Sequence, residues 1–364
     1  MDNILSTYNS LAEELVQREI QRNDKVLAIG ICTSLVRGDV WRGSDIDFLV
    51  ISEDIETKHF RAETFKGVAV DWHYFGKQFV NQLLEGYPQS FIERRLPNLL
   101  YENRIVYDPK NILKEASNFV RKYRFSTEVA YLRAQDLITR GKSELNKCNE
   151  AFNKDEYIPS VLYARQGAFY AVASLLELNQ IMFQKRKFLS QVKNSAETLG
   201  NPNFYRMYMK TRRLEYIDKD AALESLSSFQ TIIQSLLPFV EKELHNLNNE
   251  KVKQEIHTFL SRNKIFYPSY AQGLKELYEQ KRYIELVSLA ELEVIFRISS
   301  IIQSLNPALP NKESVIYANN YPADFLIHYR KVMRLESIGE GYVHVIKDIS
   351  ERLLKETKNL TIIS

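Results

Sequence analysis

The sequence predicts an α+β protein, in which a small mixed sheet with its helices is followed by a long and almost entirely helical region. The first observation is that short apolar runs alternate with helical patterns through the first 110 residues. The second is that from about residue 112 nearly every segment has helical periodicity, with few glycines and with prolines confined to a few junctions. The third is length, because 364 residues are too many for one small core and predict two or three domains.

Short apolar segments bounded by turn residues predict the elements of the first region. Leucine and isoleucine recur at helical spacing up to Ile20, and Asn23-Asp24 ends that helix. Gly86 closes a second helix, and Pro109 stops the last strand. The predicted elements are helices up to residue 22 and over 77–86, and strands over 25–34, 44–52, 67–75 and 104–108.

The helical region contains an internal repeat. Residues 204–217 (FYRMYMKTRRLEYI) and 325–338 (FLIHYRKVMRLESI) are identical at 7 of 14 positions, at a constant offset of 121. Upstream of each copy lies a long apolar helix, over 157–179 and 283–306, that begins with Tyr-Ile and ends with Leu-Asn. Such a repeat predicts two tandem helical units. The predicted domains are 1–112 with the sheet, 113–246 as the first helical unit and 247–364 as the second, with a junction at 247–255.

Composition excludes several classes of protein. With 45% hydrophobic and 26% charged residues the chain is an ordinary globular one. Its net charge of +3, the difference between 49 basic and 46 acidic residues, is too small to indicate a long nucleic acid or a membrane as partner. No segment reaches the roughly 18 unbroken apolar residues of a membrane span, and Cys32 and Cys148 are too few for a disulfide framework. We expect a cytoplasmic protein and leave its oligomeric state open.

The stretch SDIDFLV (44–50) carries two aspartates at the start of a predicted strand. Side chains alternate along a strand, so Asp45 and Asp47 are expected on one face, where their like charges repel. A divalent cation such as Mg²⁺ relieves this repulsion and prefers carboxylate oxygens. Asp71 lies midway along another predicted strand and can supply a third carboxylate, and alternation places His73 on its face and Trp72 on the opposite one. The pattern favours a metal site for phosphoryl transfer.

A turn precedes these acids and suits a phosphate. Thr33 and Ser34 end the first strand and start a short helix, which points backbone N–H groups and two hydroxyls toward one place. Arg37 and Arg42 follow in the loop and can reach phosphates, although loop arginines are most often solvated.

The stretch TSLVRG, followed by SDIDFLV and a strand aspartate, resembles the nucleotidyltransferase superfamily of the DNA polymerase β type, whose signature is Gly-Ser followed by Asp-x-Asp or Asp-x-Glu. The segment RLPNLLYENRIVYDP is most similar to the aminoglycoside (kanamycin) nucleotidyltransferase-like branch. The resemblance covers about residues 25–110, and a helical second domain is usual in that branch. It implies that Asp45 and Asp47 bind metal and that Asp71 completes the metal site or acts as a base.

The resemblance also implies a reaction. It is the Mg²⁺-dependent transfer of a nucleoside monophosphate, AMP from ATP being the first expectation, to a hydroxyl of an acceptor, with release of pyrophosphate. An aminoglycoside-like small molecule is the first acceptor class, and RNA ends or protein side chains are the others. The candidate nucleotide-binding residues are Thr33, Ser34, Arg37, Ser44 and Lys210, of which Ser34 matches the phosphate-contacting serine of the family.

Two features keep alternatives open. Thr33 stands where the family has glycine, and its Cβ hinders the approach of backbone to phosphate, so a nucleotide-binding regulatory or scaffold protein with a degenerate site is the second hypothesis. Lys210 recurs as Lys331 in the second repeat, which favours a structural role for it over phosphate binding. We expect the second helical unit to contribute no residue to the triphosphate site.

Overall fold

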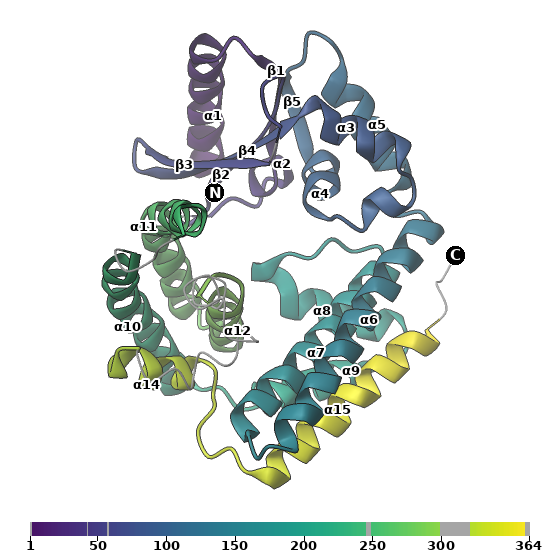
Figure 1. The fold of residues 1–364 in the computed structure, drawn as a ribbon, viewed down its shortest axis with the longest axis vertical. Coiled ribbons are helices and arrows are strands. Elements are labelled where there is room, and N and C mark those ends of the chain that lie inside the picture. Colours follow the sequence, from purple (N-terminus) through teal and green to yellow (C-terminus); the bar gives the residue numbers. More distant parts are fainter. Residues whose placement is uncertain (1, 42, 57, 245–248, 299–320, 361–364) are drawn as a thin grey trace. The chain divides into compact units, whose positions relative to one another are not determined.

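The computed structural model describes residues 2–41, 43–56, 58–244, 249–298 and 321–360. They form two compact units. The sheet unit comprises Met1–Leu132 with Ser261–Gly273, and the helical unit comprises Arg133–Leu260 with Leu274–Ser364. Figure 1 shows the elements of both units. The predicted class is confirmed, because a small mixed sheet comes first and helices follow it.

The sheet has five strands in the order β3-β4-β2-β1-β5. Strands β2 and β4 are parallel, and every other neighbouring pair is antiparallel. Four strands were predicted, whereas β3 was not, because its HFRAETF sequence is largely polar and its side chains are only half-buried or exposed. The strands are β1 (Val26–Cys32), β2 (Ile46–Ser52), β3 (His59–Phe65), β4 (Val68–Gly76) and β5 (Asn103–Tyr107).

Helices cover both faces of the sheet. On one face α1 (Asp2–Arg22) buries Leu15 against Phe48 and Trp72, all of them fully inaccessible. The other face packs against helices on the opposite side of the sheet (Figure 1). Those helices are α3 (Lys77–Glu85), α4 (Arg95–Tyr101) and α5 (Ile112–Tyr123). The short α2 (Ser34–Arg37) and the 3₁₀ turn η1 (Gln89–Phe91) complete the elements of residues 2–123.

The rest of the described chain is helical. Two of its helices, α6 and α11, belong partly to the sheet unit by compactness. None of the described helices is both long enough and apolar enough to cross a membrane. The elements are α6 (Thr127–Phe152), α7 (Tyr157–Leu178), η2 (Lys185–Lys187), α8 (Phe188–Thr198), α9 (Pro202–Thr211), α10 (Lys219–Leu244), α11 (Glu250–Glu279), α12 (Tyr283–Glu293), the π-helical turn η3 (Val294–Ile298), α14 (Ala323–Val332) and α15 (Glu340–Asn359).

The predicted domain boundaries stay a prediction. In the structure the compact sheet unit includes the residues up to Leu132. The predicted junction at 247–255 overlaps the first turns of α11, and its residues 247 and 248 lie outside the described chain. Residues 299–306 of the second predicted long helix also lie outside it.

The two copies of the sequence repeat end their helices with the same turn. Arg213 after α9 has φ 51° and Arg334 after α14 has φ 50°, in the left-handed region. The N–H of the following leucine then bonds back to the carbonyl five residues earlier, over 3.0 Å in the first copy and 2.9 Å in the second. This is the Schellman arrangement, which normally has glycine at the left-handed position. Arginine is found here because both guanidiniums are used, Arg213 donating to the Glu336 carbonyl (2.8 Å) and Arg334 to Glu291.

A buried carboxylate gathers three arginines in the helical unit. Glu291 on α12 accepts from Arg212 at Oε1 (2.8 Å) and from Arg334 at Oε2 (2.6 Å). Arg165 on α7 lies 3.9 Å from Oε1. Glu291 and Arg165 are each the ninth residue from the Tyr-Ile start of their helices, so opposite charges occupy equivalent positions of the two repeats.

Backbone carbonyls compensate the excess positive charge of this group. Arg165 donates to the carbonyls of Thr211 (2.8 Å) and Met333. These carbonyls end α9 and α14, where the helix dipole is negative. Burial alone would raise the pKa of Glu291, but Arg212, Arg334 and Arg165 outweigh it and lower that pKa. The carboxylate therefore stays ionised and joins the two repeats.

Replacing Glu291 with Gln should destabilise the helical unit by about 3–5 kcal/mol, because it leaves three buried guanidiniums without their carboxylate. Urea unfolding at neutral pH measures the change. Since the folded pKa of Glu291 is lowered, its contribution is present above about pH 4.3 and is lost as the pH falls through the folded pKa. The control is Glu224→Gln, which removes an exposed ion pair with Lys331 and should change little. Equal effects of the two variants would contradict the assignment.

Candidate functional site

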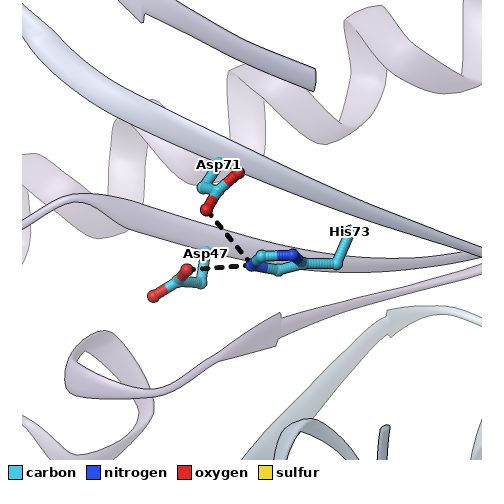
Figure 2. A group of neighbouring side chains, drawn as sticks. All are labelled: Asp47, Asp71 and His73. Carbon is cyan, nitrogen blue, oxygen red and sulfur yellow. Dashed lines mark hydrogen bonds and ion pairs between the residues drawn. The ribbon is translucent and has the colours of Figure 1, made fainter. Parts of the chain in front are cut away.

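Two carboxylates lie side by side on the parallel strands β2 and β4. Asp47 on β2 is the register partner of Asp71 on β4. His73 follows two residues later on the same face, and Trp72 points to the opposite face into the α1 core, as predicted. Figure 2 shows the three side chains converging, with dashed lines that join the imidazole to each of the two carboxylates.

The distances in this group are short. His73 Nε2 lies 3.1 Å from Asp47 Oδ1 and 3.5 Å from Asp71 Oδ2. One ligand atom from each of the three residues falls within 4.8 Å of the others. Only 3% of the Asp71 side chain and 15% of that of Asp47 are exposed, so water screens their repulsion poorly. Positive groups are required nearby.

Two arginines supply positive charge. Arg95, the first residue of α4, places Nη2 2.7 Å from His73 Nδ1 and 4.0 Å from Asp71 Oδ2. Arg262 of α11 forms an ion pair with the same Asp71 oxygen. The Phe60 ring lies beside both guanidiniums, 4.6 Å from that of Arg95 and 5.9 Å from that of Arg262. Burial and the neighbouring charge of Arg262 lower the pKa of Arg95, although Asp71 opposes this.

Asp47 is held in its ionised form. The Thr33 hydroxyl donates to its Oδ2 over 2.5 Å, and His73 contacts the other oxygen. Burial alone would raise the pKa of Asp47, but the His73 and Thr33 contacts and the charge of Arg95 lower it below the usual aspartate value.

The contacts of His73 define its hydrogen-bonding role. Arg95 Nη2 lies 2.7 Å from Nδ1 and 3.2 Å from Nε2. A guanidinium only donates, so we assign the nearer Nδ1 as the acceptor and place the proton on Nε2, which donates it to Asp47. In this tautomer the imidazole orients Asp47 and is not a metal ligand. Asp71 Oδ1 is buried and has no hydrogen-bond partner among the described residues. The ligands that remain for a cation are therefore the carboxylates of Asp47 and Asp71, which fit Mg²⁺.

The Thr33 turn has an unusual backbone. Thr33 has φ 60° and ψ −129°, a conformation that favours glycine, and its N–H donates to the Glu102 carbonyl over 3.1 Å. Ser34 then starts α2, which has only four residues and hence a weak dipole. Since the N–H and the hydroxyl of Thr33 already donate to Glu102 and Asp47, a phosphate at this turn would depend on the donors of Ser34 and the residues after it.

The other predicted residues are more scattered. Ser44 is buried and its hydroxyl accepts from the Trp41 N–H (3.0 Å), and Arg37 is paired with Glu102 and Asp39. Asp45 precedes β2, which starts one residue later, is half-buried, and is not part of the group of three. Lys210 is exposed on α9 in the helical unit, and Arg42 lies outside the described residues.

The structure corrects one expectation. Arg262 comes from the second predicted helical unit, which was expected to contribute no residue to the triphosphate site, yet it pairs with Asp71, one of the predicted site residues. Its segment of α11 packs on the loop before β2, where the Gly43 Cα faces the Ser269 carbonyl and Gly273 faces the Trp41 ring. A Cβ on Gly273 would lie 1.5 Å from that ring, so only glycine permits this approach.

Sequence reasoning missed both arginines. Arg95 opens the RLPNLLYENRIVYDP segment that carried the family resemblance, so a signal for it was present. Arg262 is 191 residues from its partner Asp71, and no local pattern links them.

No protein-family model matches the chain, and no curated protein matches it. A crystal structure of a nucleotidyltransferase-like protein from Exiguobacterium sibiricum 255-15 is similar over 81% of this chain and 90% of its own, with 13% sequence identity and a TM-score of 0.37. So low a similarity supports no inference about this chain. The case for a function therefore depends on the site itself.

Replacing Thr33 with Val keeps the branched shape and the backbone strain but removes the hydroxyl from Asp47. We expect a loss of about 1.5–3 kcal/mol in unfolding free energy at neutral pH, the range for a hydrogen bond to a charged group. Because the folded pKa of Asp47 is lowered, its stabilisation is present above the usual aspartate value of about 3.9 and is lost as the pH falls through the folded pKa. The difference between variant and wild type should therefore close in acid.

Urea unfolding at a series of pH values measures this difference. Thr198→Val is the control, because the Thr198 hydroxyl bonds only to the Asn194 carbonyl among the described contacts, over 2.9 Å. Its effect should not depend on pH. A pH-independent loss in Thr33→Val would show that the hydroxyl does not stabilise an ionised Asp47.

Proposed function

We propose that the chain is a Mg²⁺-dependent nucleotidyltransferase. It would transfer a nucleoside monophosphate, AMP from ATP in the first instance, to a hydroxyl of a small-molecule acceptor and release pyrophosphate. The observation that supports this most is the pairing of Asp47 with Asp71 on adjacent parallel strands, where one buried carboxylate oxygen has no hydrogen-bond partner in the described part of the chain. The sequence resemblance gives the reaction type.

Asp47 and Asp71 would hold the cation, with Asp45 as a further ligand from the residue before β2. A bound Mg²⁺ neutralises phosphate charge and orients the reacting phosphoryl group. Ser34 in the turn would bind phosphate oxygens through its N–H and O–H groups, because both donors of Thr33 already have partners. Thr33 and His73 fix the orientation of Asp47, through hydrogen bonds of 2.5 Å and 3.1 Å.

The contacts of Asp71 favour one of its two expected roles. The ion pair with Arg262 engages Oδ2 of Asp71, and Arg95 approaches the same oxygen, so the carboxylate already faces cationic groups. Asp71 is therefore better suited to hold a cation than to act as a general base toward the acceptor hydroxyl.

The acceptor class comes from the resemblance and from charge. A net charge of +3 gives little attraction for a long polyanion, which favours a small acceptor over a nucleic acid. An aminoglycoside-like molecule is the first candidate because of the family resemblance alone, which is an argument by analogy.

Two observations favour a second function, a nucleotide-binding regulatory or scaffold protein without transfer. Arg262 occupies an oxygen of Asp71 that a cation would need. The Thr33 side chain stands at a position whose backbone suits glycine, and its hydroxyl occupies an oxygen of Asp47. A cation would have to displace the Arg262 and Thr33 contacts from these oxygens, which makes its binding less favourable.

Transfer and binding assays separate the two functions. Nucleotide labelled in the α-phosphate is incubated with Mg²⁺ and a panel of hydroxyl acceptors, and nucleotide binding is measured by calorimetry. We expect labelled product from the wild type, and a loss of at least about a thousandfold in the double variant Asp47→Asn, Asp71→Asn, as expected when electrostatic stabilisation of the transition state is removed. Asp54→Asn is the control, because Asp54 contacts Ser52 at the other end of β2.

Each outcome has one meaning. Binding without transfer to any acceptor favours the regulatory protein. Unchanged Mg²⁺-dependent binding in the double variant contradicts the metal site. Absence of nucleotide binding in the wild type contradicts both functions.

A further inference from the structure

The ion pair between Arg262 and Asp71 is incompletely satisfied. Both Arg262 and Arg95 approach Oδ2 of Asp71, whereas Oδ1 is buried with no hydrogen-bond partner among the described residues. The Nε of Arg262 is likewise buried without one. Buried polar atoms are normally hydrogen-bonded, so a carboxylate oxygen and a guanidinium nitrogen that each lack a partner among the described residues indicate a site that can take a further ligand.

The two guanidiniums provide more positive charge than one carboxylate oxygen can neutralise. Both lie beside the Phe60 ring and approach Asp71 Oδ2. Burial and the positive charge of Arg262 lower the pKa of Arg95. Both side chains remain partly open to solvent, 27% for Arg262 and 41% for Arg95. An anion that entered here would relieve their mutual repulsion.

The backbone that carries Arg262 is anchored independently of its side chain. Gly273 contacts the Trp41 ring, and Gly43 contacts the Ser269 carbonyl, so α11 is held by close backbone packing on the loop before β2. The side chain of Arg262 can therefore change partner by rotation about its own bonds while the helix stays in place.

We propose that Arg262 is an exchangeable counter-ion that also binds the phosphates of the nucleotide. It neutralises Asp71 while the site holds no cation. Once a divalent cation is held by Asp47 and Asp71, Arg262 leaves Asp71 and pairs with a phosphate. This inference depends on the proposed nucleotide site, but not on whether a nucleotide is transferred.

Charge and geometry both favour the exchange. Asp71 beside a cation no longer needs a guanidinium, and two cations on one oxygen repel each other. A freed guanidinium next to Arg95 needs a new anion, and a phosphate accepts two parallel N–H groups from an arginine. Arg95 can stay on His73, since its Nη2 is closer to His73 Nδ1 (2.7 Å) than to Asp71 (4.0 Å).

Arg262→Gln tests the exchange through two affinities that should change in opposite directions. In the absence of nucleotide, Mn²⁺ binding is followed by electron paramagnetic resonance. We expect about tenfold tighter binding in the variant, because Asp71 no longer has a competing guanidinium. In the presence of saturating Mg²⁺, calorimetry with a non-hydrolysable ATP analogue should show binding at least about tenfold weaker, because a phosphate contact is lost.

Lys264→Gln is the matched control, since it removes one positive charge from the same segment of α11. It should leave both affinities within about threefold of the wild type, the effect of a screened distant charge. Arg262→Lys keeps the charge on a side chain of similar length and should change both affinities less than Arg262→Gln. It also provides the test if Arg262→Gln folds poorly, as judged by circular dichroism.

The outcomes are distinct. Equal or weaker Mn²⁺ binding in Arg262→Gln shows a structural ion pair and overturns the proposal. Tighter binding of both Mn²⁺ and the analogue shows an inhibitory contact without a phosphate role and also overturns it. Opposite changes support it even if no acceptor receives a nucleotide, so failure of the transferase assay and failure of this proposal are separately visible.

Discussion

The arrangement of the sheet unit depends on neutralising two carboxylates that lie side by side on β2 and β4. Four different segments contribute to this: the turn after β1 through Thr33, β4 itself through His73, α4 through Arg95 and α11 through Arg262. Since poorly screened like charges repel strongly, the strand pairing that brings them together needs these contacts. The position of α11 therefore contributes to the electrostatics of the site, because it brings Arg262 to Asp71.

The helical unit also buries a group of charged side chains, but there positive charges are in excess. Glu291 is surrounded by three guanidiniums, and both of its oxygens are hydrogen-bonded, to Arg212 and to Arg334. Carbonyls at two helix ends take the remaining donors of Arg165. Asp71 differs in having one buried oxygen without a hydrogen-bond partner among the described residues. A carboxylate whose two oxygens are both hydrogen-bonded suits a structural role, whereas one with a buried oxygen that lacks a partner among the described residues suits a ligand, which is why the function is assigned to the sheet unit.

Much of the sheet was predictable, because its inner strands are continuous apolar runs whose period is visible in the sequence. Alternation alone placed Trp72 in the core and His73 beside Asp71. The polar edge strand β3 has no apolar period and could not be predicted in this way. The positive φ of Thr33 and the ion pair of Arg262 could not be predicted either, because they follow from tertiary packing. Local sequence pattern thus predicted the carboxylates but not the arginines that neutralise them.

The central claim is that the paired carboxylates form a divalent-cation site, and anomalous diffraction from a crystal soaked in Mn²⁺ tests it most directly. The account predicts an anomalous peak in contact with carboxylate oxygens of both Asp47 and Asp71, including the buried oxygen of Asp71 for which the described residues supply no hydrogen-bond partner. A crystal that takes up Mn²⁺ elsewhere, with Arg262 still paired to Asp71 and no peak between the two strands, would contradict it.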